Sequence, residues 1–479
     1  MIPRNSLIWF SRCFLLFSIP AGLFAQTYVG GPVEGFWASV GNPYIVESTL
    51  TILPNTTLTI LPGVEVNFSN PDSIKVFGTL AVLGEPGDSV FFRNLEAPNW
   101  RGIWFLNGSA DCLVEYASIS APEWGVRAEH SQPVVRYSTI NAQTIGVGAY
   151  YSDMEVSHCA ISVTATEADA IYLLHSDASI YECRIFATAE PAAENQIGIR
   201  IVQSDPQILN NTIMADAVGM ACGIWAQESS KATVQYNLIQ AHGANIAFGG
   251  FFILSNPLFV NNTVAVASDL SNPSRDLYLL QNSDPTVENC ILYGDGASLG
   301  IYAEAGCDPE IYYTDLFNHY QNTFGCTVGV GSFIQDPLFV NAAAGNFHLQ
   351  ADSRCIDAGS PMSPLDPDGT RADMGCYYFD QSVYADPPAP TPSSHALFDA
   401  FPNPFNAQVE FIITLPASQI AQITIYDQFG RSVQRFLPGL FQAVEQRIPW
   451  NARDLGSGIY WAKLETGQEI AIIKLCLVK

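Results

Sequence analysis

Short runs of alternating apolar and polar residues, separated by turn residues, cover most of the chain. A clear example is S-D-P-Q-I-L-N-N-T-I at Ser204 to Ile213, which follows a Gly-Ile pair at Gly198 and Ile199. Alternation over a few residues is typical of half-buried β-strands, and the Ser, Asp and Pro residues between the runs mark turns. Within these units no apolar spacing of three and four residues predicts a helix. The pattern therefore predicts an all-β chain.

The phrase recurs along the chain, and successive copies are separated by 21 to 28 residues. Each copy closes on an aliphatic residue, at Ile119, Ile140, Ile161, Ile185, Ile213, Ile239, Val264, Leu292 and Leu316. A period of this length is a mark of solenoids, in which each repeat forms one coil. Because the units contain β-patterns, we expect neighbouring coils to hydrogen-bond as parallel strands about 4.8 Å apart.

One position of the phrase is restricted to small or amide-bearing residues. In chain order it holds Ala117, Ser138, Cys159, Cys183, Asn211, Asn237, Asn262, Cys290 and Thr314. Stacked asparagines can hydrogen-bond to their equivalents on the next coil, and cysteine can fill the same inward position. With this ladder, the chain resembles the right-handed parallel β-helix family of pectate-lyase-like proteins. The resemblance implies a β-helix over residues 26–380 and gives no activity, since a fold does not define a function.

The last part of the chain has a different pattern. It contains F-P-N-P-F-N, Y-D-Q-F-G-R, G-I-Y and a lysine-flanked final strand, and its short alternating runs predict a small antiparallel β-sandwich at residues 398–479. These phrases, in this order, resemble the type A C-terminal sorting domain of the type IX secretion system. The resemblance assigns the sorting motif to Pro402, Asn403, Pro404, Gly430, Arg431, Gly458, Tyr460 and Lys474. It implies the secretion machinery as a partner, and often attachment to surface lipopolysaccharide after the tail is cleaved.

Charge and the ends of the domains refine this picture. The formal net charge of −26 argues against nucleic acid as a partner, because phosphate binding needs clustered Lys and Arg. Residues 1–25 have the layout of a cleaved signal peptide, and no other run is long enough to cross a membrane. Residues 381–397 are rich in Pro and Ser and predict a linker. We therefore expect a secreted protein, either extracellular or on the outer cell surface.

One column of the repeat is a candidate binding surface. The residue after each Gly-Ile pair, or its equivalent, should point outward because its neighbours point inward. The candidates for glycan binding in this column are Trp104, Arg127, Tyr172, Arg200, Trp225, Tyr278 and Tyr302, with the register between Phe248 and Ile253 unresolved. Aromatic rings and guanidinium groups suit sugar rings and uronate carboxylates. The alternative is that these side chains simply pack on one another. A second column contains His130, Tyr151 and His175, whose two histidines are too far apart to share a metal.

Other chemistry has less support in the sequence. The paired carboxylates of a polygalacturonase-type hydrolase are missing, and no acidic cluster accompanies Arg127, Tyr172 and Arg200 as a calcium-dependent lyase would need. We assign no catalytic residue and no cofactor. Asp366, Asp368 and Asp373 offer oxygen ligands for Ca²⁺, although a turn made rigid by Pro367 and Gly369 is the favoured explanation. Off the ladder column, Cys307 with Cys326 and Cys355 with Cys376 are candidate disulfides.

Together these patterns predict a cell-surface or extracellular β-helix protein that binds polysaccharide or serves as an adhesin scaffold. The first alternative is a polysaccharide lyase or glycoside hydrolase with a divergent active site. The second is a purely structural surface component.

Overall fold

The computed structural model describes residues 26–95, 99–107, 109, 111–120, 122–188, 194–269, 274–383, 397–415, 419–428, 431–436, 439–441, 446–453, 455–466 and 470–479. The chain divides into two compact units, residues 1–379 and residues 380–479. The expected signal peptide at 1–25 and most of the expected linker lie outside the described residues. Within the part that the structure describes, no helix has the length and apolar character to span a membrane.

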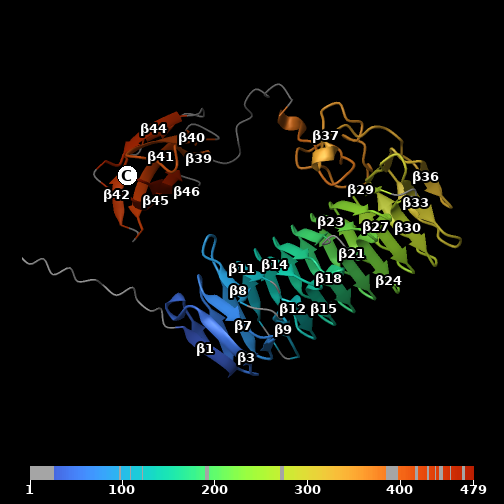
Figure 1. Cartoon of the computed structure of the whole chain (residues 1–479). Helices are drawn as coiled ribbons and strands as arrows, with labels where there is room; N and C mark the ends of the chain where they lie inside the picture. Colours follow the sequence, from blue (N-terminus) through green and yellow to red (C-terminus); the bar gives the residue numbers. More distant parts are fainter. Residues whose placement is uncertain are drawn as a thin grey trace, which may run out of the picture. The chain divides into compact units, whose positions relative to one another are not determined.

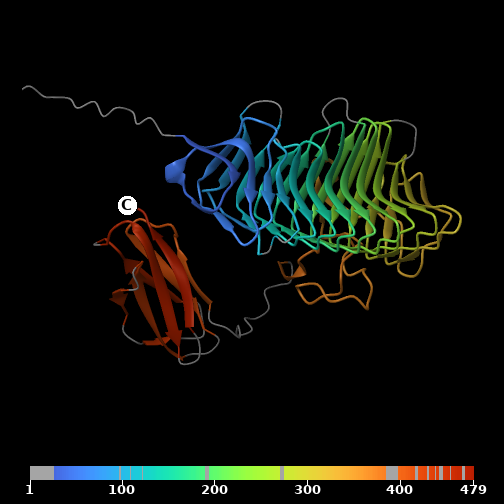
Figure 2. The same ribbon diagram turned by 90° about the horizontal axis from the view of Figure 1, so that it is seen from below.

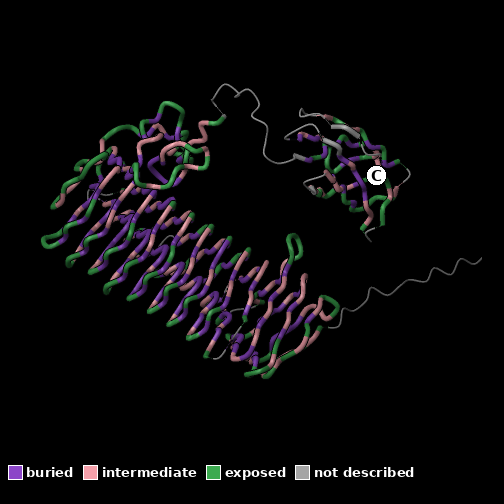
Figure 3. Tube along the Cα trace, turned by 180° about the vertical axis from the view of Figure 1, so that it is seen from behind, coloured by how far each residue is buried: buried purple, intermediate pink, exposed green. Residues whose placement is uncertain are grey.

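The first unit is a right-handed parallel β-helix, as the sequence predicted (Figures 1 and 2). A typical coil consists of β22 (Gln207–Leu209), β23 (Thr212–Ala217) and β24 (Met220–Gln227), and each strand pairs in parallel with its equivalent one coil away. The strands therefore form three stacks, which we name after their first members. Buried residues lie along the strands and exposed residues at the turns (Figure 3).

The β2 stack is a 12-stranded sheet. It comprises β2 (Gly35–Trp37), β4 (Thr57–Ile60), β7 (Thr79–Leu83), β10 (Leu113–Glu115), β13 (Val134–Arg136), β16 (Glu155–Ser157), β19 (Ser179–Tyr181), β22 (Gln207–Leu209), β25 (Thr233–Gln235), β28 (Leu258–Val260), β31 (Thr286–Glu288) and β34 (Glu310–Tyr312).

The β5 and β6 stacks belong to one 24-stranded sheet, joined through β3 (Tyr44–Ile52), on which β1 (Thr27–Pro32) pairs. The β5 stack comprises β5 (Glu65–Phe68), β8 (Val90–Asn94), β11 (Ala117–Ser120), β14 (Thr139–Ala142), β17 (Ala160–Val163), β20 (Arg184–Thr188), β23 (Thr212–Ala217), β26 (Leu238–Gly243), β29 (Thr263–Ser268), β32 (Ile291–Tyr293) and β35 (Asp315–Phe317). The β6 stack comprises β6 (Ile74–Val76), β9 (Ile103–Phe105), β12 (Trp124–Glu129), β15 (Ile145–Tyr150), β18 (Glu167–Leu174), β21 (Asn195–Val202), β24 (Met220–Gln227), β27 (Ile246–Ile253), β30 (Arg275–Leu280), β33 (Leu299–Ala303) and β36 (Gln321–Phe324).

The asparagine ladder is present as predicted. The side-chain amide of Asn211 donates to Asn237 Oδ1 at 3.0 Å, and that of Asn237 donates to Asn262 Oδ1 at 3.0 Å. Each Oδ1 also accepts a backbone N–H from the coil before it. All three side chains are buried, so this file satisfies polar groups at the turn between the β2 and β5 stacks.

A second ladder, of serines, runs along the turn between the β6 and β2 stacks. Ser152 N–H donates to Ser176 Oγ at 3.0 Å, Ser176 N–H to Ser204 Oγ at 2.9 Å, and Ser204 N–H to Ser230 Oγ at 3.2 Å. From the sequence, these serines were predicted only to be turn residues. The available signal was their regular recurrence two residues before Met154, Ala178, Pro206 and Ala232.

Residues after β36 fold back onto the outer face of the β5 stack. The hairpin of β37 (Phe339–Asn341) and β38 (Asn346–Leu349), joined by the 3₁₀ turn η2 (Ala342–Ala344), packs with Leu238 and Ile291 in a small core. Figure 1 shows this extension beside the coils. The remaining short helices are η1 (Ser39–Gly41) and η3 (Gln381–Val383).

The four cysteines expected to pair are free thiols. Cys355 Sγ instead lies 3.5 Å from an Asp315 carboxylate oxygen, and the Cys376 N–H donates to Thr263 Oγ1 at 3.0 Å. Cys307 is buried in the main core, and the partly buried Cys326 packs against that core. The disulfide hypothesis was therefore wrong for this structure. Cys159, Cys183 and Cys290 are buried thiols in the ladder, as predicted.

The second unit is an antiparallel β-structure with its own apolar core. One sheet contains β39 (Leu397–Phe401), β40 (Gln408–Thr414) and β44 (Gln446–Asn451). The other contains β41 (Gln419–Asp427), β42 (Ser432–Arg435), β43 (Gly439–Phe441), β45 (Gly458–Thr466) and β46 (Ile470–Leu477).

Candidate functional site

The predicted binding column is a single file on the outer face of the β6 stack. Register places every candidate opposite the next along successive strands. We call this set the outer file: Lys75, Trp104, Arg127, Gly148, Tyr172, Arg200, Trp225, Phe251, Tyr278, Tyr302 and Phe324. Phe251 fills the gap that the sequence left unresolved. Most members are half-buried, and Phe324 at the end is 45% exposed.

Arg127 is the centre of the first cluster in the outer file. Its guanidinium carbon lies 5.3 Å from the ring centre of Trp104, 4.9 Å from that of Trp124 and 4.7 Å from that of Tyr150. Glu129 pairs with the same guanidinium at 3.2 Å. The rings therefore hold the cation in place, and one carboxylate already neutralises part of its charge.

Arg200 forms the second cluster. Its Nε donates to both carboxylate oxygens of Asp169 at 3.1 Å, and its guanidinium lies 4.8 Å from the Trp225 ring. Burial raises the pKa of Asp169, and the positive charge of Arg200 only partly offsets this effect. Burial also raises the pKa of Tyr172, the neighbour of Arg200 in the file.

Aromatic rings dominate the third cluster. Phe251 stacks on Tyr278 at 5.1 Å, and Tyr302 stacks on Phe324 at 4.5 Å. Arg275 lies 4.7 Å from the Tyr278 ring. The rings of this cluster do pack on one another, as the alternative interpretation held; Phe251 is buried, while Tyr278, Tyr302 and Phe324 stay partly accessible.

Four residues beside the file were missed by the sequence analysis. Trp124, Tyr150, Phe248 and Arg275 lie on the same strands and contact members of the file. Trp124, Phe248 and Arg275 lie three residues before the predicted column, where an outward direction depends on a local irregularity of the strand, whereas Tyr150 lies two residues after Gly148 and follows from alternation. The available signal was a large side chain next to or near the glycine of the repeat, as in Trp124 before Gly125 and Phe248 before Gly249.

An acidic hollow adjoins Arg200, contrary to the expectation that no acids accompany it. The hollow has a volume of about 250 Å³, and Glu167, Asp169, Asn195 and Arg200 contribute to its lining. Asn195 Nδ2 contacts Glu167 Oε1 at 3.5 Å. The acids were missed because they lie before the Ala170-Ile171 pair that replaces Gly-Ile in the long strand β18, Asp169 directly before it and Glu167 three residues before Ala170.

The column with two histidines forms an exposed stack. Tyr151 lies between His130 and His175, with ring centres 4.9 and 4.6 Å apart. The three residues share a left-handed backbone, with φ of 51° at each. The stack separates the histidines, as expected.

The candidate calcium loop is held by its own backbone. Asp373 accepts N–H groups from Asp357 at 2.7 Å and Phe379 at 2.6 Å, and Asp366 accepts from the Asp373 N–H at 2.8 Å. Asp368 accepts both the N–H and the hydroxyl of Thr370. Burial raises the pKa of Asp373 to about 6. Over the described part of the chain, no group of three or more His, Cys, Asp or Glu residues is arranged to hold a metal.

In the second unit, the residues of the sorting motif mostly secure the fold. Asn403 Nδ2 donates to the Lys474 carbonyl at 2.7 Å, and Asn403 Oδ1 accepts the Cys476 N–H at 2.9 Å. The P-N-P segment of Pro402 and Pro404 is thereby fixed to the final strand β46. Lys474 itself is exposed opposite Trp461.

The other motif phrases close turns. Arg431 Nε donates to Asp427 Oδ2 at 2.8 Å, and the Arg431 N–H donates to Asp427 Oδ1 at 2.9 Å. Tyr460 Oη donates to the Gly456 carbonyl at 2.9 Å, two residues before Gly458. Gly430 lies outside the described residues.

Two family models match the chain in the places that this geometry indicates. Residues 101–264 match a right-handed beta helix region, and residues 399–479 match a secretion system C-terminal sorting domain. The chain is a right-handed β-helix protein with a secretion sorting domain. The sorting domain indicates export through the type IX secretion system, to the cell surface or the extracellular space.

Among solved structures, the crystal structure of pectate lyase Pel9A is similar to this β-helix protein at 11% sequence identity. The match covers 68% of this chain and 88% of that chain, with a TM-score of 0.41. No curated protein sequence matches the chain.

Proposed function

We propose that this exported β-helix protein binds an extended polysaccharide along the outer file. The observation that supports the proposal is the continuity of the file, which places an aromatic or guanidinium group on every coil from Trp104 to Phe324 except at Gly148. These groups are partly exposed, apart from Phe251, which is buried. Coils repeat at about 4.8 Å, so the file offers evenly spaced contacts to a linear polymer. A cell-surface protein with such a face is suited to adhesion.

The chemistry of the file favours stacking over ion pairing. Arg127 is paired with Glu129 and Arg200 with Asp169, which leaves less charge for a uronate. The formal net charge of −26 also repels polyanions. We therefore infer that neutral polysaccharides bind at least as well as acidic ones, through ring edges, tyrosine hydroxyls and arginine planes.

The acidic hollow supports a second candidate, the lyase or hydrolase. Asp169, with its raised pKa, lies beside Arg200 and Tyr172 on the same face as the file. A carboxyl group with a raised pKa and a neighbouring cation is a frequent feature of acid–base sites. In this reading Asp169 would exchange the proton and Arg200 would hold an anionic substrate. A structural surface component remains the third candidate, with no dedicated ligand.

One experiment separates these functions. The purified full-length chain is run through native gels containing neutral or acidic polysaccharides, and the same mixtures are assayed for new unsaturated or reducing ends. Retardation without products supports the binding function. Products that disappear in Asp169→Asn would replace it with the enzyme, and absence of both would favour the structural role.

Export is tested separately. A chain that ends at Asp380 should fold its β-helix but stay in the periplasm, whereas the full-length chain should reach the surface. We further propose that attachment to surface lipopolysaccharide follows removal of the tail. Surface display of the shortened chain would contradict the role of the second unit, and a surface form that keeps residues 398–479 would contradict the removal step.

A further inference from the structure

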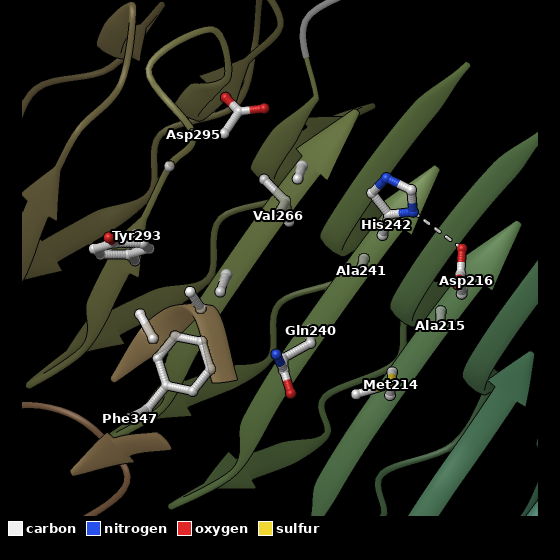
Figure 4. Close-up of a pocket in the computed structure, with 15 residues that line it drawn as sticks. Met214, Ala215, Asp216, Gln240, Ala241, His242, Val266, Tyr293, Asp295 and Phe347 are labelled. Carbon is white, nitrogen blue, oxygen red and sulfur yellow. Dashed lines mark hydrogen bonds and ion pairs between the residues drawn. The ribbon is translucent and has the colours of Figure 1, made fainter. Parts of the chain in front are cut away.

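A second hollow lies on the outer face of the β5 stack, away from the residues of the outer file. Its volume is about 350 Å³, which falls in the range of roughly 300–1,000 Å³ typical of small-molecule sites. Strands β23, β26 and β29, the end of β32 and the turn η2 with Phe347 surround it (Figure 4). Nothing in the proposed function uses this hollow.

The hollow exists because large side chains are missing from one strand of the outer face of the β5 stack. Register places Met214, Gln240, Ala265, Tyr293 and Phe317 in one column on successive strands. A neighbouring column runs Asp216, His242 and Ala267. Both columns reach alanine on β29, so the large side chains of β26 and β32 stand two coils apart, about 10 Å. A gap of this width takes one ring in van der Waals contact with both sides.

One side of the gap is aromatic and held in place. Tyr293 packs against Phe317, Phe339 and Phe347, with ring centres 5.9, 5.3 and 6.4 Å away. Burial raises the pKa of Tyr293, so its hydroxyl stays protonated at neutral pH. Phe347 and Ala342 of the folded-back extension complete an apolar wall. This wall suits the C–H face of a sugar ring.

The opposite side is polar and also held in place. His242 is bound between Asp216 at 3.1 Å and Asp269 at 3.3 Å, and Figure 4 shows His242 and Asp216 on the other side of β29 from Tyr293. Partial burial lowers the pKa of His242, but hydrogen bonds to the two aspartates and their charges outweigh it and raise the pKa overall. The side-chain amide of Gln240 has no hydrogen-bond partner among the described residues and lines the hollow, so it is available to a ligand.

Charge decides which kind of ring fits. Asp216 and Asp269 flank the imidazole of His242, and Asp295 lines the hollow on the Tyr293 side, so a carboxylate, sulfate or phosphate group would be repelled. Carboxylate and amide oxygens accept hydrogen bonds from hydroxyl groups. An aromatic wall opposite hydrogen-bond acceptors is a combination that matches a hydroxyl-rich ring without negative charge.

We infer that this hollow binds a neutral hexopyranose ring, as a free sugar or as the end of a glycan. The ring would stack on Tyr293 and direct its hydroxyls to Gln240, Asp216 and Asp295. The site is independent of the outer file, so either can fail without the other.

The test uses saturation-transfer NMR on the full-length chain with methyl glycosides of glucose, galactose and mannose, and with glucuronate. We expect transfer to the ring protons of at least one neutral glycoside and little to glucuronate. Ala267→Leu, which adds a large side chain to β29, should reduce this signal at least about tenfold. Gln240→Leu should weaken the saturation-transfer signal while leaving the apolar wall intact. This variant replaces Ala267→Leu as the test if Ala267→Leu fails to fold.

The matched control is Phe36→Ala, which removes a 77% exposed aromatic side chain outside both sites and should leave the signal unchanged. Trp225→Ala separates the two sites, because the part of the signal that comes from the hollow should persist in it. Absence of transfer to every neutral glycoside would overturn the inference. A signal that survives both Ala267→Leu and Gln240→Leu, or that is lost only in Trp225→Ala, would also overturn it.

Discussion

The asparagine ladder and the outer file run along the same coils with the same period, but their side chains lie in different surroundings. In the ladder, Asn211, Asn237 and Asn262 are buried and fully hydrogen-bonded, and only small or amide-bearing residues occupy the column. In the outer file, Trp, Arg, Gly, Tyr and Phe share one column on a half-exposed face. Burial at the ladder therefore restricts which residue types can occupy the column, whereas the half-exposed outer column accepts many residue types and can vary with function.

The largest effect should come from breaking the ladder with Asn237→Leu. The change removes the acceptor of the Asn211 N–H and amide, and the donor to the Ile208 carbonyl. Because buried unpaired groups cost about 1–3 kcal/mol each, we expect a loss of about 3–6 kcal/mol in the free energy of unfolding. Urea denaturation followed by tryptophan fluorescence measures it.

The chain supplies its own control for that substitution. Cysteine occupies the same column at Cys290, where Sγ contacts the Phe259 carbonyl at 3.4 Å. Asn237→Cys should therefore cost much less than Asn237→Leu. Equal costs would mean that hydrogen bonding does not set the residue type of the ladder.

A smaller effect on stability is expected from the ionisation of a carboxyl group in the region where the extension covers the outer face of the β5 stack and buries it. There burial raises the pKa of Asp315 from 3.8 to about 7, despite the Gln335 N–H that donates to it at 3.0 Å. The folded state thus holds a proton that the unfolded state has lost. Stability should be greatest below pH 4 and should fall as pH rises towards about 7, by up to about 4 kcal/mol.

Asp315→Asn tests this pH dependence. The amide cannot ionise, and its oxygen can still accept the Gln335 N–H. The variant should lose the part of the slope of stability against pH between 4 and 7 that Asp315 contributes and keep the part due to Asp373, measured by urea denaturation at several pH values. An unchanged slope would assign the dependence to other groups.

Removing a cation from the outer file should have a moderate effect. Arg200→Leu leaves the Asp169 carboxylate, whose side chain is only 14% exposed, without its ion pair. Since both groups retain some solvent contact, we expect a loss of about 1–3 kcal/mol at pH 7. The loss should shrink on acidification, because neutral Asp169 needs no partner. Thermal unfolding at pH 4 and pH 7 checks this expectation, which a constant loss would contradict.

The smallest effect on stability is expected for Trp225→Ala. Trp225 is half-buried and contacts Arg200 and the edge of Phe251. Its removal should cost about 1 kcal/mol, the scale of a single aromatic contact. Thermal unfolding measures this cost. A loss comparable to that of Asn237→Leu would show that the outer file serves the fold.

The contrast also explains what could be predicted from the sequence. The ladder was predictable because Asn211, Asn237 and Asn262 repeat at a fixed place in a strict phrase, and the outward column followed from strand alternation. Asp169, Phe248 and Arg275 were missed because their direction depends on irregularities within longer strands. The hollow at Ala265 and Ala267 could not be predicted, because Phe347 and the turn η2 reach it from more than seventy residues away. Free cysteines likewise depend on spatial neighbours that spacing does not reveal.

The most direct test of the account is the affinity of the outer file for polysaccharide. The full-length chain and its Tyr172→Ala, Trp225→Ala double variant are compared by affinity electrophoresis in gels that contain a series of neutral and acidic polysaccharides. We expect retardation of the unmodified chain by at least one polysaccharide, and a loss of about tenfold or more in affinity for the double variant. The folded but weakened Asn237→Cys variant should bind normally. Equal retardation of the double variant and the unmodified chain would contradict the proposed binding face.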